Sequence, residues 1–261
     1  MTWPDSCSSS ESSQRDAGTE LYRAGCRCFQ SHRGPDRLRG NGLSTMGRPY
    51  DLIVFDWDGT LMDSERKIVR CMSAAAADLG IPDPGSAAIR DIIGLGLDEA
   101  MQRLYPQAPT GLRQQLVQRY RAHFLELDRT DMPLFPGVEA GLAELARDGY
   151  LLAVATGKAR RGLDRVLHET GTGRYFTATR CADEAFSKPH PKMLEDILDQ
   201  TGTDRVRALM VGDTTYDMEM ARNAGVDALA VCYGVHARAQ LLECGALGCA
   251  ESFAAVCRWI Q

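Results

Sequence analysis

Short runs of consecutive apolar residues divide the chain from residue 50 onward. Leu52–Phe55 is the first, and similar runs recur at 150–155, 208–211 and 228–232. Unbroken apolar runs of this length are typical of parallel strands that are buried on both faces. Stretches with helical spacing lie between the last three runs, at 158–170, 191–201 and 216–224. This alternation predicts an α/β fold, built on a doubly wound parallel sheet.

Residues 66–132 interrupt the alternation, because they show helical spacing and no convincing strand. Glycines and prolines break this interval into four predicted helices, at 66–79, 86–93, 97–104 and 111–127. The pattern predicts a small helical domain over 66–132, inserted into a core domain made of 49–65 and 133–261. The Pro-rich connection at 131–137 is predicted to act as a hinge.

The first 48 residues have a different character. They are rich in serine and glycine and show neither helical nor strand periodicity, so they are predicted to be a disordered tail. Acidic residues are spread through the segment, and it lacks the apolar centre of a secretory signal. A further hypothesis is that translation begins at Met46, just before the first predicted strand.

Composition narrows the classes of partner. The 261 residues carry 30 Lys+Arg and 35 Asp+Glu, a net charge of −5, and no long basic run, which argues against nucleic acid as a partner. No apolar run approaches the ~20 residues of a membrane span. The nine cysteines include no Cys-x-x-Cys pair, so we expect reduced thiols in a cytoplasmic protein rather than a disulfide framework or a zinc site.

The strongest chemical signal follows the first predicted strand. Asp56 and Asp58, two apart in an extended segment, point to the same side and can face one reaction centre. Two carboxylates so close repel each other unless a cation lies between them or one is protonated. A calcium loop beginning at Asp56 requires a glutamate at its twelfth position, where this chain has Lys67, so that interpretation is rejected.

Three later segments end predicted strands or precede helices. Thr156 and Gly157 place a hydroxyl and an open backbone at a helix start, which suits a phosphate group. Lys188 directly precedes a short loop with two prolines, Pro189 and Pro191, and can balance clustered negative charge. Asp213 and Asp217, four apart at the end of a strand, are suited to Mg²⁺, which prefers oxygen ligands.

In this order, the four segments resemble the motifs of the haloacid dehalogenase superfamily of phosphohydrolases, over residues 51 to about 235. The helical insertion resembles the cap of the subgroup that includes phosphoglycolate phosphatases and β-phosphoglucomutases. Within it, residues 93–97 (Ile-Gly-Leu-Gly-Leu) resemble a substrate-facing cap loop, although a Gly-rich helix break explains them equally well.

The resemblance implies a role for each matching residue. Asp56 is the implied nucleophile, which forms an aspartyl-phosphate, and Asp58 the general acid and base. Mg²⁺ is implied at Asp56, the backbone carbonyl of Asp58 and Asp213, with Asp217 close by or ligating. The implied phosphate-binding groups are the remaining motif residues, Thr156, Gly157 and Lys188.

The implied function is an Mg²⁺-dependent phosphatase acting on a small phosphorylated metabolite, with 2-phosphoglycolate as the first candidate. A phosphomutase of the β-phosphoglucomutase type and a non-catalytic phosphate-binding regulator are the alternatives. Dehalogenation is disfavoured, because dehalogenases lack the second carboxylate that Asp58 supplies. Basic residues of the insertion are candidates for binding a substrate carboxylate, namely Lys67, Arg70 and Arg90. The arginines at 160, 161 and 165 are interpreted as a solvated helix face, and oligomeric state is left open.

Overall fold

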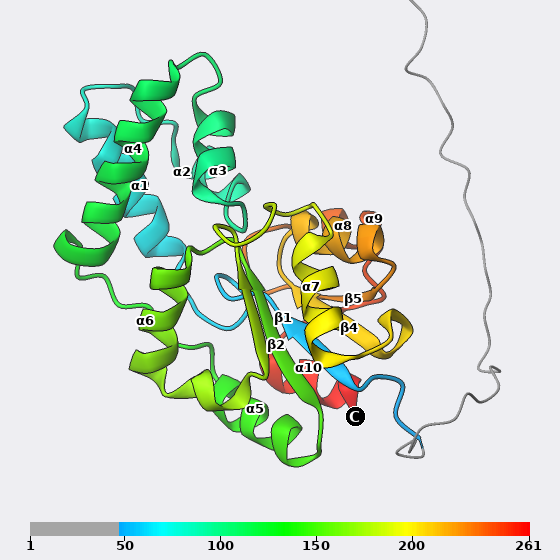
Figure 1. Ribbon diagram of the computed structural model, residues 1–261. Helices are drawn as coiled ribbons and strands as arrows, with labels where there is room; N and C mark the ends of the chain where they lie inside the picture. The colour runs from blue at the N-terminus through cyan, green and yellow to red at the C-terminus, as the bar shows by residue number, and fades with distance from the viewer. Residues whose placement is uncertain (1–46) are drawn as a thin grey trace, which may run out of the picture. The chain divides into compact units, whose positions relative to one another are not determined.

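The computed structural model describes residues 47–261, and at its centre is a six-stranded parallel sheet (Figure 1). The hypothesis of a start at Met46 and nearly all of the predicted tail over residues 1–48 lie outside the described residues. The strands are β1 (Leu52–Phe55), β2 (Leu151–Thr156), β3 (Ala178–Cys181), β4 (Ala208–Gly212), β5 (Asp227–Val231) and β6 (Cys249–Ala250).

α-Helices of 6 to 14 residues cover the sheet and fill one long connection. Between β1 and β2 lie α1 (Glu65–Asp78), α2 (Ser86–Asp91), α3 (Leu97–Leu104), α4 (Thr110–Ala122), the π-helical turn η1 (His123–Leu127) and α5 (Val138–Arg147). The later elements are α6 (Arg160–Thr170), η2 (Thr172–Tyr175), α7 (Lys192–Thr201), η3 (Arg205–Arg207), α8 (Thr215–Ala224), α9 (Arg238–Glu243) and α10 (Phe253–Ile260).

The strand order is β3-β2-β1-β4-β5-β6, so β1 lies at the centre. Phe55, the last residue of β1, is in register with Val154 on one side and Val211 on the other. The chain order reverses at this point of the sheet, and such a switch point opens a crevice beyond the carboxyl ends of the strands. The residues that follow β1, β2 and β4 therefore converge.

Each face of the sheet has its own apolar core, because alternate strand residues point to opposite faces. Ile53 and Phe55 belong to the core beneath α5, α6 and α10, whereas Leu52 and Val54 belong to the core beneath α7, α8 and α9. All four are fully buried. A strand buried on both faces reads as an unbroken apolar run, which is why the sequence revealed β1 so clearly.

Helices α1 to α4 and η1, which we call the helical insert, have a separate core. It contains Ile68 and Met72 of α1, Met101 of α3, and Leu116 of α4, among others. The two segments that connect the sheet to the helical insert, at residues 61–63 and 133–135, are hydrogen-bonded to each other. Asp63 N donates to Pro133 O at 2.9 Å, and Phe135 N donates to Leu61 O at 3.0 Å.

The predicted α/β fold with a doubly wound parallel sheet is confirmed. Two strands were not predicted, and both lie at sheet edges. β3 has the half-exposed polar residues Thr179 and Arg180 in its middle, and β6 is two residues long, so neither has an apolar run. Among the helices of residues 47–261, none combines the length and the apolar character of a bilayer-spanning segment.

One expectation about the cysteines is wrong. Cys232 and Cys249 form a disulfide, with their Cα atoms 5.9 Å apart. Neighbouring parallel strands bring them together, since Cys249 pairs with Ala230 at the end of β5. The other described cysteines are free thiols, as expected, namely Cys71, Cys181, Cys244 and Cys257.

Candidate active site

The ends of β1 and β4 place two aspartates side by side in the switch-point crevice. Asp56 continues the ladder after β1, because its N–H donates to Val211 O at 2.9 Å, and Asp213 directly follows β4. Both side chains are fully buried. One carboxylate oxygen each from Asp56, Asp213 and Asp217 lies within 4.8 Å of the others.

Asp213 is held in place by close backbone packing and two hydrogen bonds. Thr60 Oγ1 and Val235 N each donate to its carboxylate at 2.9 Å. A Cβ on Gly59 would lie 2.1 Å from Asp213 Oδ2, and one on Gly234 would lie 2.2 Å from Asp213 Cβ. Gly59 also has φ +83°, a conformation that favours glycine. The loops after β1 and β5 thus fit tightly around this carboxylate.

Lys188 joins the first and last motifs. Its Nζ lies 2.7 Å from Asp56 Oδ1 and 2.7 Å from Asp217 Oδ1, and its side chain is fully buried. The other oxygen of Asp217 accepts from Thr214 N and Thr214 Oγ1, at 3.0 and 2.7 Å, and so caps helix α8. Asp217 is therefore fixed by its own helix and orients the lysine.

Asp58 faces a different set of partners. Ser64 Oγ donates to Asp58 Oδ1, and Lys158 Nζ lies 2.9 Å from the same oxygen. Its side chain is 11% exposed, whereas that of Asp56 is 1% exposed. Asp58 is thus the one motif carboxylate with access to the space between the sheet and the helical insert.

The second motif lies against the helical insert. Thr156 is buried at the end of β2, and its Oγ1 accepts from Lys158 N at 3.2 Å. A Cβ on Gly157 would lie 2.5 Å from the carbonyl oxygens of both Gly94 and Leu95. Glycine at 157 is therefore required for the close approach of the 93–97 loop.

The same loop contacts the third motif. Gly96 N donates to Ser187 Oγ at 2.8 Å, next to Lys188. Ile93, Gly94, Leu95 and Leu97 line a cavity together with Asp58, so the loop faces the site rather than serving only as a helix break.

A family model described as haloacid dehalogenase-like hydrolase matches residues 53–231. The chain is 39% identical over 194 residues to "Probable phosphatase IndB" of Dickeya dadantii, which covers 73% of this chain and 84% of that protein. It is 32% identical over 196 residues to a phosphoglycolate phosphatase of Cupriavidus necator, which covers 74% of this chain and 85% of that protein. The chain belongs to the haloacid dehalogenase-like hydrolase family.

A solved structure agrees with this family assignment at the level of the fold. It is a "predicted phosphoglycolate phosphatase" from Haemophilus somnus, with a TM-score of 0.75 and 23% identity, and it covers 84% of this chain and 100% of that one. The resemblance to the phosphoglycolate phosphatase-like subgroup is confirmed, and this haloacid dehalogenase-like hydrolase is a phosphatase of the family.

The charges of the aspartate cluster suit a divalent cation. Three carboxylates face one ammonium group, that of Lys188, which leaves two negative charges when all are ionised. Among the described side chains, Asp56 has only Lys188 as a close polar partner, at 2.7 Å from Oδ1. Oxygen-rich, charge-rich clusters of this kind are the sites that hard cations occupy.

The raised pKa values of Asp56 and Asp213 also favour a bound cation. Burial raises the pKa of Asp56 to about 7; Lys188 opposes the shift, and the charge of Asp217 adds to it. Burial, followed by the charges of Asp56 and Asp217, raises the pKa of Asp213 well above its ordinary value. Carboxylates that are this costly to ionise without a cation fit a metal ion that would offset their repulsion.

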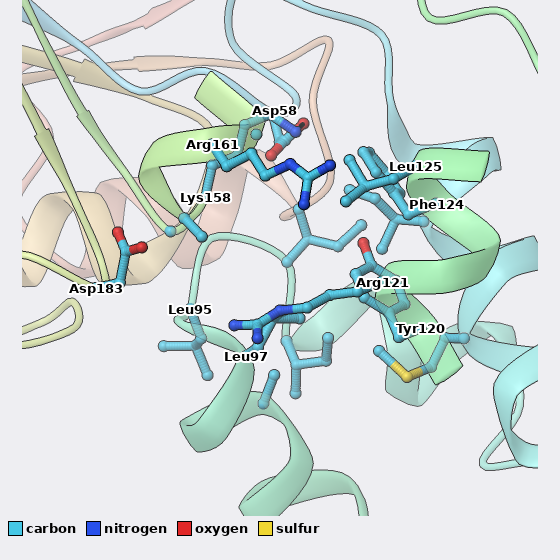
Figure 2. A pocket seen from close by; sticks show the side chains of 18 of the residues that line it. Asp58, Leu95, Leu97, Tyr120, Arg121, Phe124, Leu125, Lys158, Arg161 and Asp183 are labelled. Atoms are coloured by element: carbon cyan, nitrogen blue, oxygen red, sulfur yellow. Dashed lines mark ion pairs between the residues drawn. The ribbon is translucent and has the colours of Figure 1, made fainter. Parts of the chain in front are cut away.

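A cavity of about 500 Å³ lies between the site and the helical insert (Figure 2). It is lined by Asp58, Gly157 and Lys158 on the core side and by residues of α1, the loop at 92–95, α3, α4 and η1 on the other. Lys158 Nζ lies 4.9 Å from the ring centroid of Phe124, so an aromatic residue of the insert covers the Asp58–Lys158 pair.

Several contacts of the site were not predicted from the sequence. Lys158, Ser64 and Thr60 each bind a motif carboxylate. Lys158 directly follows the predicted Thr-Gly pair, so its position at a strand end was an available signal. Ser64 and Thr60 carry no such signal, because a hydroxyl in an acidic turn usually serves as a cap.

The basic residues of the insertion that were candidates for binding a substrate carboxylate have partners in or directly beside the insertion. Lys67 donates to Asp128 O, Arg70 pairs with Asp128, and Arg90 pairs with Glu65. None of the three lines the cavity. Arg161, interpreted from the sequence as part of a solvated face, is exposed as expected, and it also lines the cavity together with Arg121, which is exposed as well.

Proposed function

We propose that this phosphatase is magnesium-dependent, that it hydrolyses a small phosphorylated metabolite, and that it does so through an aspartyl-phosphate at Asp56. The observation that carries the proposal is the state of Asp56. It is fully buried, and its one close polar partner among the described side chains is Lys188, at 2.7 Å. A carboxylate that is shielded from bulk solvent is a stronger nucleophile than an exposed one.

In the first step, an oxygen of Asp56 attacks phosphorus and the bond from phosphorus to the ester oxygen breaks. Asp58, in its protonated form, gives its proton to the departing alkoxide. Asp58 borders the cavity in which the leaving group would lie, whereas Asp56 is buried behind it. The buried Asp56 is thus placed to attack phosphorus, and Asp58 at the cavity wall is placed to protonate the leaving group.

In the second step, water attacks the phosphorus of the aspartyl-phosphate. Asp58 now accepts a proton from that water, and the bond between phosphorus and Asp56 breaks, which restores both carboxyl groups and releases phosphate. Lys158 and Ser64, which hold Asp58 Oδ1, fix its orientation through both steps.

The phosphoryl oxygens carry negative charge that needs binding groups. Lys188 supplies a fixed positive charge, and Thr156 and the N–H of Gly157 supply donors at the end of β2. Asp56, Asp213 and the backbone carbonyl of Asp58 would hold Mg²⁺, with Asp217 orienting Lys188 beside them. When bound, the cation would offset the repulsion between the attacking carboxylate and the phosphate.

The helical insert acts as a cap domain over residues 66–132 in this proposal, with the core formed by 49–65 and 133–261. Its support is the contact between the 93–97 loop and Gly157, and the cover that Phe124 gives to Lys158. A cap that opens and closes would admit substrate and then exclude bulk water from the first step.

The test is phosphate release by the full chain from a panel of small phosphate esters, with and without Mg²⁺. 2-Phosphoglycolate is included because relatives are named for it. We expect release that requires Mg²⁺ and is lost in Asp56→Asn. Metal-independent release, or release that survives in Asp56→Asn, would refute the proposal. Return of the phosphoryl group to a sugar phosphate would identify a phosphomutase instead.

A further inference from the structure

The cavity between the core and the helical insert is larger than a two-carbon substrate needs. Its volume of about 500 Å³ falls in the range of sites that enclose drug-sized ligands, roughly 300–1,000 Å³. The phosphate itself would bind deeper, at Asp56 and Lys188. The volume beyond Asp58 is therefore available to the leaving group alone.

The walls of this cavity are mostly apolar. Side chains from the insert supply most of the apolar surface, namely Met72, Ile92, Leu95, Leu97, Phe124 and Leu125. Leu95 and Leu97 lie on one side and Phe124 and Leu125 on the other in Figure 2. Such walls favour an apolar body over a hydroxyl-rich one, since hydroxyls buried against them would lose their hydrogen bonds.

Two arginines reach into the same cavity from opposite sides. Arg121 comes from α4 of the insert and Arg161 from α6 of the core. In Figure 2 the Arg161 side chain extends across the cavity toward Leu125, and the Arg121 side chain extends the opposite way toward Leu97. Within residues 47–261, neither has an acidic partner within 4.0 Å or a side-chain hydrogen bond. Their neighbours on α6 differ, because Arg160 pairs with Glu184 and Arg165 pairs with Glu169.

The acidic residues at the cavity do not neutralise these arginines. Asp58 is paired with Lys158 at 2.9 Å, and Asp183 accepts from Arg160 N at 2.9 Å at the start of α6. Glu126 also lines the cavity, from η1, and forms no ion pair in the described part of the chain. Two guanidinium groups thus remain available to an anion that enters between the core and the insert.

We propose that Arg121 and Arg161 form an anion-binding subsite, and that the substrate is a phosphate monoester with an apolar body and a second anionic group, carboxylate or phosphate, at its far end. This inference rests on the proposed function and specifies its substrate class. Because one arginine comes from the insert and the other from the core, the far anion would also hold the two together around the substrate. Each guanidinium group presents several N–H donors in one plane, a geometry that suits a planar carboxylate or a phosphate.

The test is a series of ω-phosphooxy carboxylic acids, from 2-phosphoglycolate to esters several methylenes longer, compared with alkyl phosphates of matched length. With wild-type protein and Mg²⁺, each added methylene that is buried should raise kcat/KM roughly three- to four-fold. Once the chain spans the cavity, the terminal carboxylate should add about ten- to hundred-fold over the matched alkyl phosphate.

The variants Arg121→Gln and Arg161→Gln should each reduce this carboxylate advantage to within about three-fold of unity. The matched control is Arg119→Gln, on the same helix as Arg121 but outside the cavity, which should keep the full advantage. Comparing kcat/KM for esters that end in a phosphate with kcat/KM for those that end in a carboxylate shows which anion the subsite prefers. Calorimetric binding of the same esters to Asp56→Asn would show the same ranking without turnover.

Two results would overturn the subsite. One is a preference for 2-phosphoglycolate over every longer ester, and the other is an equal loss in both variants for the charged and the uncharged esters. Either result leaves the phosphatase intact, because phosphate is still released. If wild-type protein with Mg²⁺ released phosphate from no ester, the proposed function would fail instead, and this inference with it.

Discussion

Lys158 Nζ lies 2.9 Å from Asp58 Oδ1, and this ion pair joins the ends of β2 and β1 beneath the ring of Phe124. The lysine side chain is 7% exposed and the aspartate side chain 11% exposed. An ion pair with so little solvent has fewer alternative partners than a surface pair. The position of the Asp58 carboxyl group therefore depends on Lys158 and Ser64.

Replacing Lys158 with Met should keep the apolar contact with Phe124 and remove the charge. We expect kcat/KM to fall about ten-fold or more, since a misplaced acid and base loses part of the ~10²–10⁴-fold that general acid–base catalysis supplies. The measurement is steady-state phosphate release. Lys192→Met is the control, because Lys192 forms an exposed pair with Asp196. Equal rates in Lys158→Met and wild-type protein would contradict the positioning role.

Asp56→Asn should lower kcat by about 10³-fold or more, because the covalent step would vanish while binding and the fold remain. Asp63→Asn is the matched control, since Asp63 lies at the end of the same segment and is exposed. We expect the control to keep wild-type kcat. A kcat in Asp56→Asn within ten-fold of the wild-type value would argue against the nucleophile.

Stability should depend on pH and metal together. The pKa of Asp56 is raised to about 7 and that of Asp213 is also raised, so between the unfolded values near 4 and pH 7 the folded state holds more protons than the unfolded state. The free energy of unfolding should therefore fall as pH rises through this window when a chelator is present. We expect a Tm lower by about 5 °C at pH 8 than at pH 5.

Added Mg²⁺ should raise Tm more at pH 8 than at pH 5, because the carboxylates must be ionised to bind it. Asp213→Asn is the informative variant, since it removes one of the raised groups and one proposed ligand. In that variant both the pH dependence in chelator and the response to Mg²⁺ should shrink. An Mg²⁺ response of equal size at both pH values would count against the proposed site.

Gly157→Ala should disturb the contact between β2 and the insert. The new Cβ would lie 2.5 Å from two carbonyl oxygens of the 93–97 loop, so the loop must move away. We expect KM to rise at least about five-fold, since displacement at a substrate-facing wall costs on the order of 1 kcal/mol. Gly162→Ala, whose Cβ meets nothing within 4 Å, is the control for a glycine that also lines the cavity. An unchanged KM in Gly157→Ala would show that the loop is free to adjust.

The parts of this protein that were predicted from sequence are those with a strong local pattern. β1, β2, β4 and β5 contain unbroken apolar runs, and the motif segments of Asp56, Thr156 and Asp213 each follow one of these runs, so their convergence was expected. Lys188 follows no such run and precedes a helix. The edge strand β3 has two adjacent polar residues, Thr179 and Arg180, in its middle, and its sequence does not distinguish it from a loop. The helix predicted over 111–127 corresponds to α4 together with the π-helical turn η1, which the sequence did not distinguish from α-helix.

Side-chain contacts that depend on how the insertion packs could not be predicted from the sequence. Nothing in the sequence says that Arg161 turns into the cavity while Arg160 and Arg165, on the same helix, pair with glutamates. Lys67 was an attractive candidate for a substrate group, but it is buried and donates to Asp128 O. The Cys232–Cys249 pair depends on the adjacency of β5 and β6, which strand order alone decides.

The central claim is that the phosphoryl group is transferred to Asp56, and rapid acid quench tests it most directly. Wild-type protein with Mg²⁺ and a hydrolysed ester is quenched within the first turnovers, digested and analysed by mass spectrometry. We expect one phosphoryl group on the peptide that contains Asp56, absent in Asp56→Asn and present in the Asp63→Asn control. Phosphate release at full rate with an unmodified Asp56 peptide, or a phosphoryl group on another residue, would contradict the account.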